Sequence, residues 1–95
     1  MNAETNPTLP EHPKLNRLFR LQYEEAQKTH VLLYPEGMVK LNQSASEILL
    51  LCDGQRTVHD IVVALEAKFG ASGLQADIES MLQEAVRRNW LEEAQ

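Results

Sequence analysis

The chain has 95 residues, a formal net charge of −5 and a single cysteine, so one small domain without an internal disulfide is expected. No stretch of the sequence approaches the roughly 20 apolar residues of a membrane span, and its start does not have the pattern of a signal peptide. These features exclude a membrane-spanning protein and predict a cytoplasmic location.

The first fourteen residues are predicted to be a disordered tail, and residues 15–95 to be the folded domain. Three of the four prolines, Pro7, Pro10 and Pro13, lie in this polar stretch, which has too few apolar side chains to build a core. The remaining eighty or so residues can bury only roughly 60% of their unfolded surface, so the sequence predicts modest stability or support from a partner.

Three apolar segments predict three antiparallel strands: residues 19–23, 31–34 and 38–41. Pro35, Glu36 and Gly37 form a tight turn between the last two of these strands. In the third strand, Val39 and Leu41 alternate with Lys40. A sheet of three strands leaves two edges with unpaired backbone groups, which an extended peptide can pair with. The alternative is that Lys40 only protects this edge from aggregation.

Three amphipathic helices are predicted after the strands. The first begins at Asn42 or Ser44 and ends at Gly54, the second runs from Thr57 to Gly70, and the third runs from about residue 74 to 89. Their buried positions are Ala45, Ile48, Leu49 and Cys52, then Val58, Ile61, Val62, Leu65 and Phe69, then Ile78, Leu82, Ala85 and Val86, with Met81 at the margin. Trp90 and Leu91 are expected to close the chain onto the core. The predicted fold class is α+β and winged helix-turn-helix-like, with a three-stranded antiparallel sheet followed by three α-helices.

The sequence contains no recognisable catalytic or metal-binding motif. Cys52 lies on an apolar helix face and is expected to be a core residue. His12, His30 and His59 fall in the tail, a strand and a helix start, without the spacing of metal ligands. There is also no glycine-rich phosphate loop and no nucleophile elbow. We therefore expect no enzyme activity, no metal and no cofactor.

A winged helix-turn-helix architecture raises the alternative of a DNA-binding or regulatory module. The helix that would enter the major groove carries Asp77, Glu79 and Glu84 against Arg87 and Arg88, a sum of −1 (two minus three). Such a helix on an acidic domain repels phosphates. Nucleic-acid binding is therefore not expected, and a partner subunit would have to supply the basic surface.

A set of residues distributed along the domain resembles the PqqD proteins of pyrroloquinoline quinone (PQQ) biosynthesis over about residues 15–92. The set is Tyr34–Gly37, Leu41–Asn42, Ala45, Ile48–Leu49, Cys52–Gly54, Thr57–Val58, Ile61 and Leu65. The resemblance implies a stand-alone RiPP recognition element, a non-enzymatic chaperone that binds the PqqA precursor peptide and presents it to the radical S-adenosylmethionine enzyme PqqE. His30 departs from the family, where an aromatic residue is common, and Asn89 stands where a glycine is common.

The resemblance further implies that the peptide adds as a strand beside the third strand, with the third helix as the opposite wall. This nominates Met38, Val39, Lys40 and Leu41 for backbone pairing. At about 100° per residue, four residues of the third helix fall in a narrow arc beside its core stripe: Asp77, Met81, Glu84 and Arg88. A structural subunit of a larger enzyme is the other alternative. A monomer or weak homodimer is expected, since an unpaired edge invites strand-mediated dimers.

Overall fold

A computed structural model describes residues 8–94, which form an α+β domain. The elements in chain order are β1 (Pro13–Leu15), β2 (Arg20–Glu24), β3 (Thr29–Tyr34), β4 (Gly37–Lys40), α1 (Gln43–Leu50), α2 (Val58–Phe69), α3 (Gln75–Arg87) and β5 (Leu91–Glu93). The predicted class, a three-stranded antiparallel sheet followed by three helices, is confirmed. Within residues 8–94, no helix has both the length and the apolar character that crossing a membrane requires.

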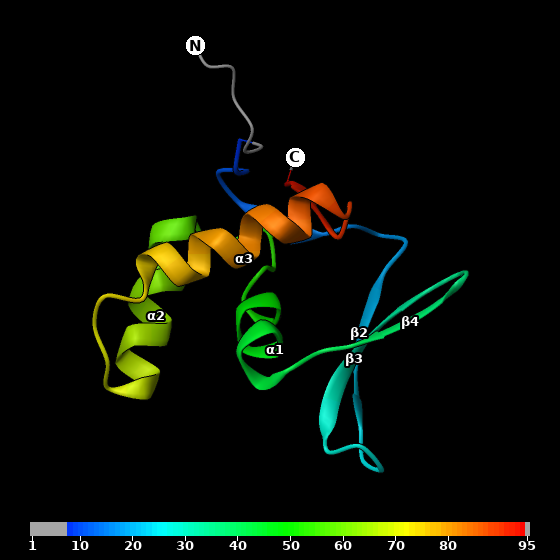
Figure 1. The fold of residues 1–95 in the computed structure, drawn as a ribbon. Helices are drawn as coiled ribbons and strands as arrows, with labels where there is room; N and C mark the ends of the chain where they lie inside the picture. Colours follow the sequence, from blue (N-terminus) through cyan, green and yellow to red (C-terminus); the bar gives the residue numbers. More distant parts are fainter. Residues whose placement is uncertain (1–7, 95) are drawn as a thin grey trace.

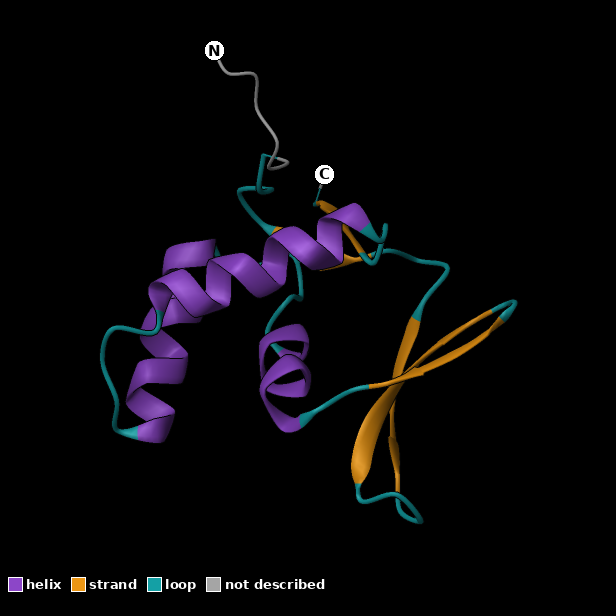
Figure 2. Ribbon diagram, in the orientation of Figure 1, coloured by secondary structure: helices purple, strands orange, loops and turns teal. Residues whose placement is uncertain are grey.

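The main sheet has the strand order β2–β3–β4 and stands beside the helices (Figure 2). Leu32 of β3 lies opposite Leu21 of β2 and Val39 of β4. Because residues paired across a sheet share one face, these three side chains point together toward the helices, where Leu32 is fully buried.

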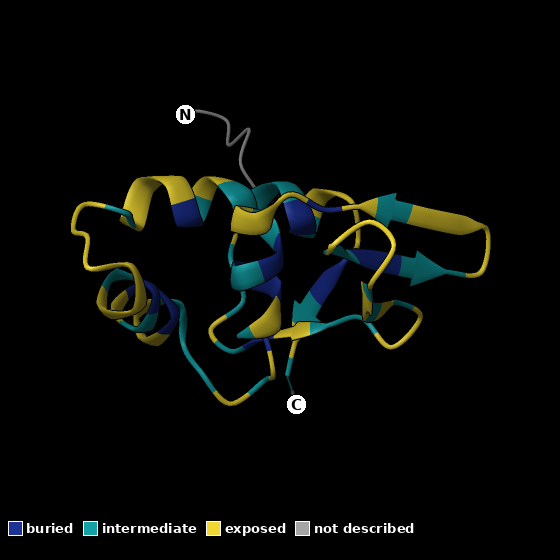
Figure 3. Cartoon of the chain, turned by 90° about the horizontal axis from the view of Figure 1, so that it is seen from below, coloured by how far each residue is buried: buried dark blue, intermediate teal, exposed yellow. Residues whose placement is uncertain are grey.

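The three helices form the other part of the domain. Helix α3 lies across α1 and α2, and α1 stands between α2 and the sheet (Figure 1). Buried segments are concentrated where the helices and sheet face one another (Figure 3). The core consists of Leu32, Leu41, Ile48, Leu49, Cys52, Ile61, Val62, Leu65, Ile78, Leu82, Ala85, Trp90 and Leu91. The predicted closure by Trp90 and Leu91 is thus confirmed.

One predicted core residue is exposed. Phe69 has 47% of its surface accessible, although it continues the apolar stripe of α2. It is the last residue of α2, and Gly70 follows in the left-handed conformation with φ of 59°. The helix therefore ends at the margin of the core, and the ring of Phe69 lines an open hollow instead.

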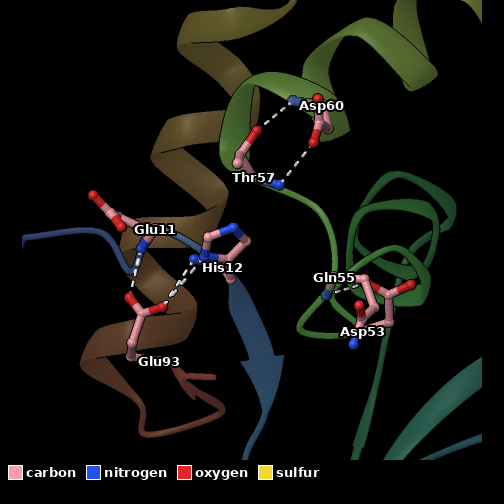
Figure 4. Close-up of polar contacts among 7 residues, drawn as sticks. All are labelled: Glu11, His12, Asp53, Gln55, Thr57, Asp60 and Glu93. Atoms are coloured by element: carbon pink, nitrogen blue, oxygen red, sulfur yellow. Dashed lines mark hydrogen bonds and ion pairs between the residues drawn. The ribbon is translucent and has the colours of Figure 1, made fainter. Parts of the chain in front are cut away.

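The helix ends are set by local hydrogen bonds. Asn42 is the cap of α1, because its Oδ1 accepts the Ala45 N–H at 2.8 Å. Helix α1 ends at Leu50 with Leu51 as its C-cap, so Gly54, with φ of 81°, lies in the turn after the helix and not at the helix end predicted for it. Thr57 and Asp60 form a reciprocal capping box at the start of α2, with bonds of 3.0 and 3.1 Å (Figure 4).

The N-terminal segment is more ordered than predicted. Strand β1 pairs antiparallel with β5, with Leu15 opposite Leu91. On the other side of β1, the backbone of Lys14 forms an isolated antiparallel β-bridge with the backbone of Asp53. Next to it, the Gly54 N–H donates to the Pro13 carbonyl at 3.0 Å. Proline is tolerated as the first residue of a strand. The predicted tail of residues 1–14 is therefore wrong for Pro13 and Lys14, and residues 1–7 lie outside the described part of the chain.

Glu93 holds the segment that precedes β1. Its Oε1 accepts the Glu11 N–H at 2.6 Å and its Oε2 accepts the His12 N–H at 3.0 Å (Figure 4). One carboxylate at the C-terminal end therefore satisfies two backbone donors near the N-terminal end, as charge-assisted hydrogen bonds.

Candidate functional site

Strand β4 is an edge of the main sheet, since it pairs only with β3. The Leu41 N–H donates to the His30 carbonyl at 3.1 Å. In an antiparallel pair, the backbone groups of successive residues point alternately toward and away from the partner strand. Val39 therefore also points its backbone at β3, whereas Met38 and Lys40 point their N–H and C=O groups outward, away from the sheet.

The side chains of these four residues divide differently. Leu41 is buried and Val39 half-buried on the core face, whereas Met38 and Lys40 are exposed on the opposite face. Val39 and Leu41 thus stabilise the core. The groups of β4 that remain free for a ligand are the outward backbone of Met38 and Lys40.

A hollow of about 290 Å³ lies between β4 and the C-terminal half of α3. Its lining contains six of the eight residues nominated from the sequence: Val39, Lys40, Leu41, Met81, Glu84 and Arg88. Asn42, Ala45 and Trp90 complete it. We call it the β4 hollow. The structure therefore brings the proposed strand edge and helical wall together around one space, with Met38 and Asp77 outside it.

A second hollow of about 440 Å³ adjoins the first and contains Asp77. It lies between α1, α2 and α3, and we call it the α2 hollow. The two hollows share Asn42, Ala45 and Met81 in their linings, so they lie next to each other along one flank of α3. We call the two hollows together the α3 trough. Sequence reasoning missed the α2 hollow, because Phe69 and Leu74 have the same apolar character as core residues.

The charges along the α3 trough are unevenly paired. The Glu84 carboxylate is 2.6 Å from Arg88 Nε and 3.3 Å from Arg87 Nη2. The hydrogen bond from Arg88 holds the pKa of Glu84 below its ordinary range, so this carboxylate is ionised at neutral pH. The Arg88 guanidinium also lies 5.6 Å from the centre of the Trp90 ring. Asp77, in contrast, is in none of the ion pairs among residues 8–94.

Cys52, the single cysteine, lines neither hollow. Cys52 is buried, its Sγ lies 3.4 Å from the Ile48 carbonyl, and burial raises the pKa of the thiol to about 12. Across the described residues 8–94, no three His, Cys, Asp or Glu side chains gather in a way that would hold a metal ion. The rings of His30 and Tyr23 pack edge to face, with their centres 5.2 Å apart.

Comparison with known proteins gives the same assignment as the geometry of the fold. Residues 29–91 match the family described as "Coenzyme PQQ synthesis protein D (PqqD)". The chain belongs to the PqqD family. It is 49% identical over 80 residues to a "PqqA binding protein" of Methylococcus capsulatus, covering 84% of this chain and 86% of that one. A "PqqA binding protein" of Stutzerimonas stutzeri is 52% identical over 85 residues, covering 88% and 92%.

A solved structure of the PqqD family has the same fold. The solution NMR structure of the PqqD part of Methylobacterium extorquens PqqCD, described as a functional and stand-alone RiPP recognition element, superposes with a TM-score of 0.73. The two chains are 36% identical, with 85% of this chain and 88% of the other covered. Relatives named as binding proteins and a recognition element confirm the expectation of a non-enzymatic PqqD protein of PQQ biosynthesis.

Proposed function

We propose that this chain binds the PqqA precursor peptide as an added strand on β4 and presents it to the radical S-adenosylmethionine enzyme PqqE. One observation carries the proposal: the free backbone edge of β4 borders the α3 trough. A peptide paired with that edge can therefore also contact side chains of α3. The relatives named for PqqA binding support the identity of the peptide.

Strand addition divides the work between backbone and side chains. Main-chain hydrogen bonds to Met38 and Lys40 supply affinity that depends little on peptide sequence, whereas the pockets beside the strand supply specificity. Within the β4 hollow, Met81 offers an adaptable apolar surface and Trp90 a rigid one. When no peptide is bound, the charge of Lys40 and the shortness of β4 limit pairing between copies of the chain.

The backbone claim can be tested with two substitutions at Lys40. Lys40→Pro removes the outward N–H, and Lys40→Ala removes the charged side chain but keeps that N–H. We expect the proline variant to bind PqqA at least about ten-fold more weakly than wild type, and the alanine variant to bind within about three-fold of it. Isothermal titration calorimetry measures both affinities, and two-dimensional NMR spectra of the free variants establish that each is folded. Equal affinity of a folded Lys40→Pro variant and wild type would rule out strand addition at this edge.

Presentation to PqqE requires that the enzyme bind the chain while the peptide occupies β4. We infer that the free chain is a monomer or weak homodimer, and that any dimer pairs through the same edge. Sedimentation velocity with increasing PqqA should then convert dimer to a one-to-one complex, to which PqqE adds. A dimer unaffected by saturating peptide would contradict the shared edge, and failure of PqqE to join the complex would contradict presentation.

A further inference from the structure

Strand addition to β4 leaves the α2 hollow unused. Its walls are largely apolar, with Ile48 from α1, Leu65 and Phe69 from α2, and Leu74, Ile78 and Met81 at or on α3. A volume of about 440 Å³ lies within the range of roughly 300–1,000 Å³ typical of ligand sites. An open apolar hollow of this size, with a half-exposed phenylalanine at its side, has surface available for a bulky side chain.

Two carboxylates line the α2 hollow, and among residues 8–94 only one of them has an ion-pair partner. Glu47 is tied to Lys68, with Oε1 and Nζ 2.7 Å apart, and the Lys68 ammonium lies 5.9 Å from the centre of the Phe69 ring. This contact connects α1 and α2 and places Phe69 beside the ion pair. Asp77 also lines the hollow, and none of the ion pairs of residues 8–94 includes it. The hollow therefore combines an apolar interior with one carboxylate that lies in the first turn of α3, where the helix dipole favours it, and that is in none of these ion pairs.

We propose that the α2 hollow is a specificity pocket for the precursor peptide, which inserts one bulky apolar side chain there and places a neighbouring lysine or arginine at Asp77. The inference rests on the proposed function, because the same peptide must occupy β4. It is favoured by the adjacency of the two hollows, which share Asn42, Ala45 and Met81 in their linings, and by the charge of Asp77.

The length of the α3 trough determines how far this anchor lies from the paired strand. Asp77 and Arg88 are eleven positions apart, which at about 1.5 Å per residue is roughly 16 Å of helix. An extended peptide covers that distance in about five residues. The apolar and basic residues are therefore expected within about five positions of the peptide segment that contacts Arg88.

The two ends of the α3 trough also differ in charge, which gives the peptide a preferred direction. Lys40 and Arg88 against Glu84 give the lining of the β4 hollow a sum of +1 (two minus one). The α2 hollow has the unpaired carboxylate of Asp77. A peptide whose basic residue lies at Asp77 and whose acidic residue lies near Arg88 matches both ends, whereas the reversed peptide meets like charges at both.

Calorimetric titration of PqqA against matched variants tests the pocket. Phe69→Ala removes a wall, and Val63→Ala is its control, since Val63 is a 51% exposed residue of α2 that lines neither hollow. We expect about ten-fold weaker binding for Phe69→Ala and binding within two-fold of wild type for Val63→Ala. Ala71→Trp fills the hollow from an exposed position without deleting a core contact, and is also expected to weaken binding about ten-fold.

The charge is tested by Asp77→Asn, with Glu79→Gln as the control because Glu79 lies on α3 but lines neither hollow of the α3 trough. We expect about three- to five-fold weaker binding for Asp77→Asn at low salt, with a smaller loss of affinity between low and high salt than wild type. Wild-type affinity in Phe69→Ala, Ala71→Trp and Asp77→Asn, together with lost binding in Lys40→Pro, would overturn the pocket and leave strand addition standing. A wild-type chain that does not bind PqqA would overturn both.

Discussion

Burial controls the acid–base chemistry of Cys52. Burial and, to a smaller extent, the charge of Asp53 raise the pKa of its thiol from an ordinary value near 9 to about 12. Between these values the folded protein keeps a proton that the unfolded chain releases, so the stabilisation is fully present below pH 9 and is lost as the pH rises toward 12. We expect the free energy of unfolding to fall more steeply from pH 8 to pH 11 in wild type than in Cys52→Ala, as measured by urea unfolding. Parallel pH profiles would contradict this.

The sequence predicted individual residues well where helical periodicity decides their burial. Ile48 on α1 and Leu82 on α3 are in the core because each belongs to an apolar stripe on one face of its own helix, and Cys52 continues the stripe of α1 just after that helix ends. Phe69 fits the same pattern but is exposed. Periodicity shows which side of the helix a side chain lies on, but not whether another element packs against that side. The α2 hollow, which depends on this missing cover, could not be derived from the pattern.

A capping interaction at the start of α2 contributes to stability at the scale of one element. The Asp60 N–H donates to the Thr57 hydroxyl, and the Thr57 N–H donates to the Asp60 carboxylate. The hydrogen bond from the Thr57 N–H lowers the pKa of the Asp60 carboxyl. We expect Thr57→Ala to lower the free energy of unfolding by about 1 kcal/mol. Ser44→Ala is the matched control, because Ser44 has the spacing of a cap but Asn42 occupies that role. Urea unfolding that gives both variants the same stability would contradict the assignment.

Long elements were predicted more reliably than short ones. The three strands of the main sheet and helices α2 and α3 were predicted to within about two residues of their observed bounds, whereas α1 ends at Leu50, four residues before the predicted Gly54. Strands β1 and β5 have three residues each, too few to show a period, and their partners lie at opposite ends of the sequence, as the pairing of Pro13 with Glu93 shows. The prediction that the edge of β4 and one flank of α3 face each other came from the family resemblance. Periodicity alone does not place a strand edge against a helix flank.

The two ends of the described chain close the domain outside the α3 trough and meet its lining at Trp90. Strand β1 lies between β5 and the turn at Asp53, and Asn16 donates to the Trp90 carbonyl at 2.8 Å. This small sheet therefore connects the N-terminal segment, the link between α1 and α2, and the residues after α3. The α3 trough is formed by other elements, β4, α1, α2 and α3, with Trp90 as the shared residue.

This arrangement predicts that losing β1 affects stability first and peptide binding only through it. A chain lacking residues 1–15 loses the β1–β5 ladder and the buried Pro13, so we expect its free energy of unfolding to fall by roughly 3 kcal/mol or more, a large part of the total for a small domain. A chain that starts at Thr8 keeps every contact among residues 8–94 and is the control. Thermal unfolding with and without PqqA separates the effects: because a ligand of the folded state stabilises it by mass action, peptide should raise the melting temperature of the shorter chain as well. Equal melting temperatures of the two truncated chains would show that β1 does not support the core.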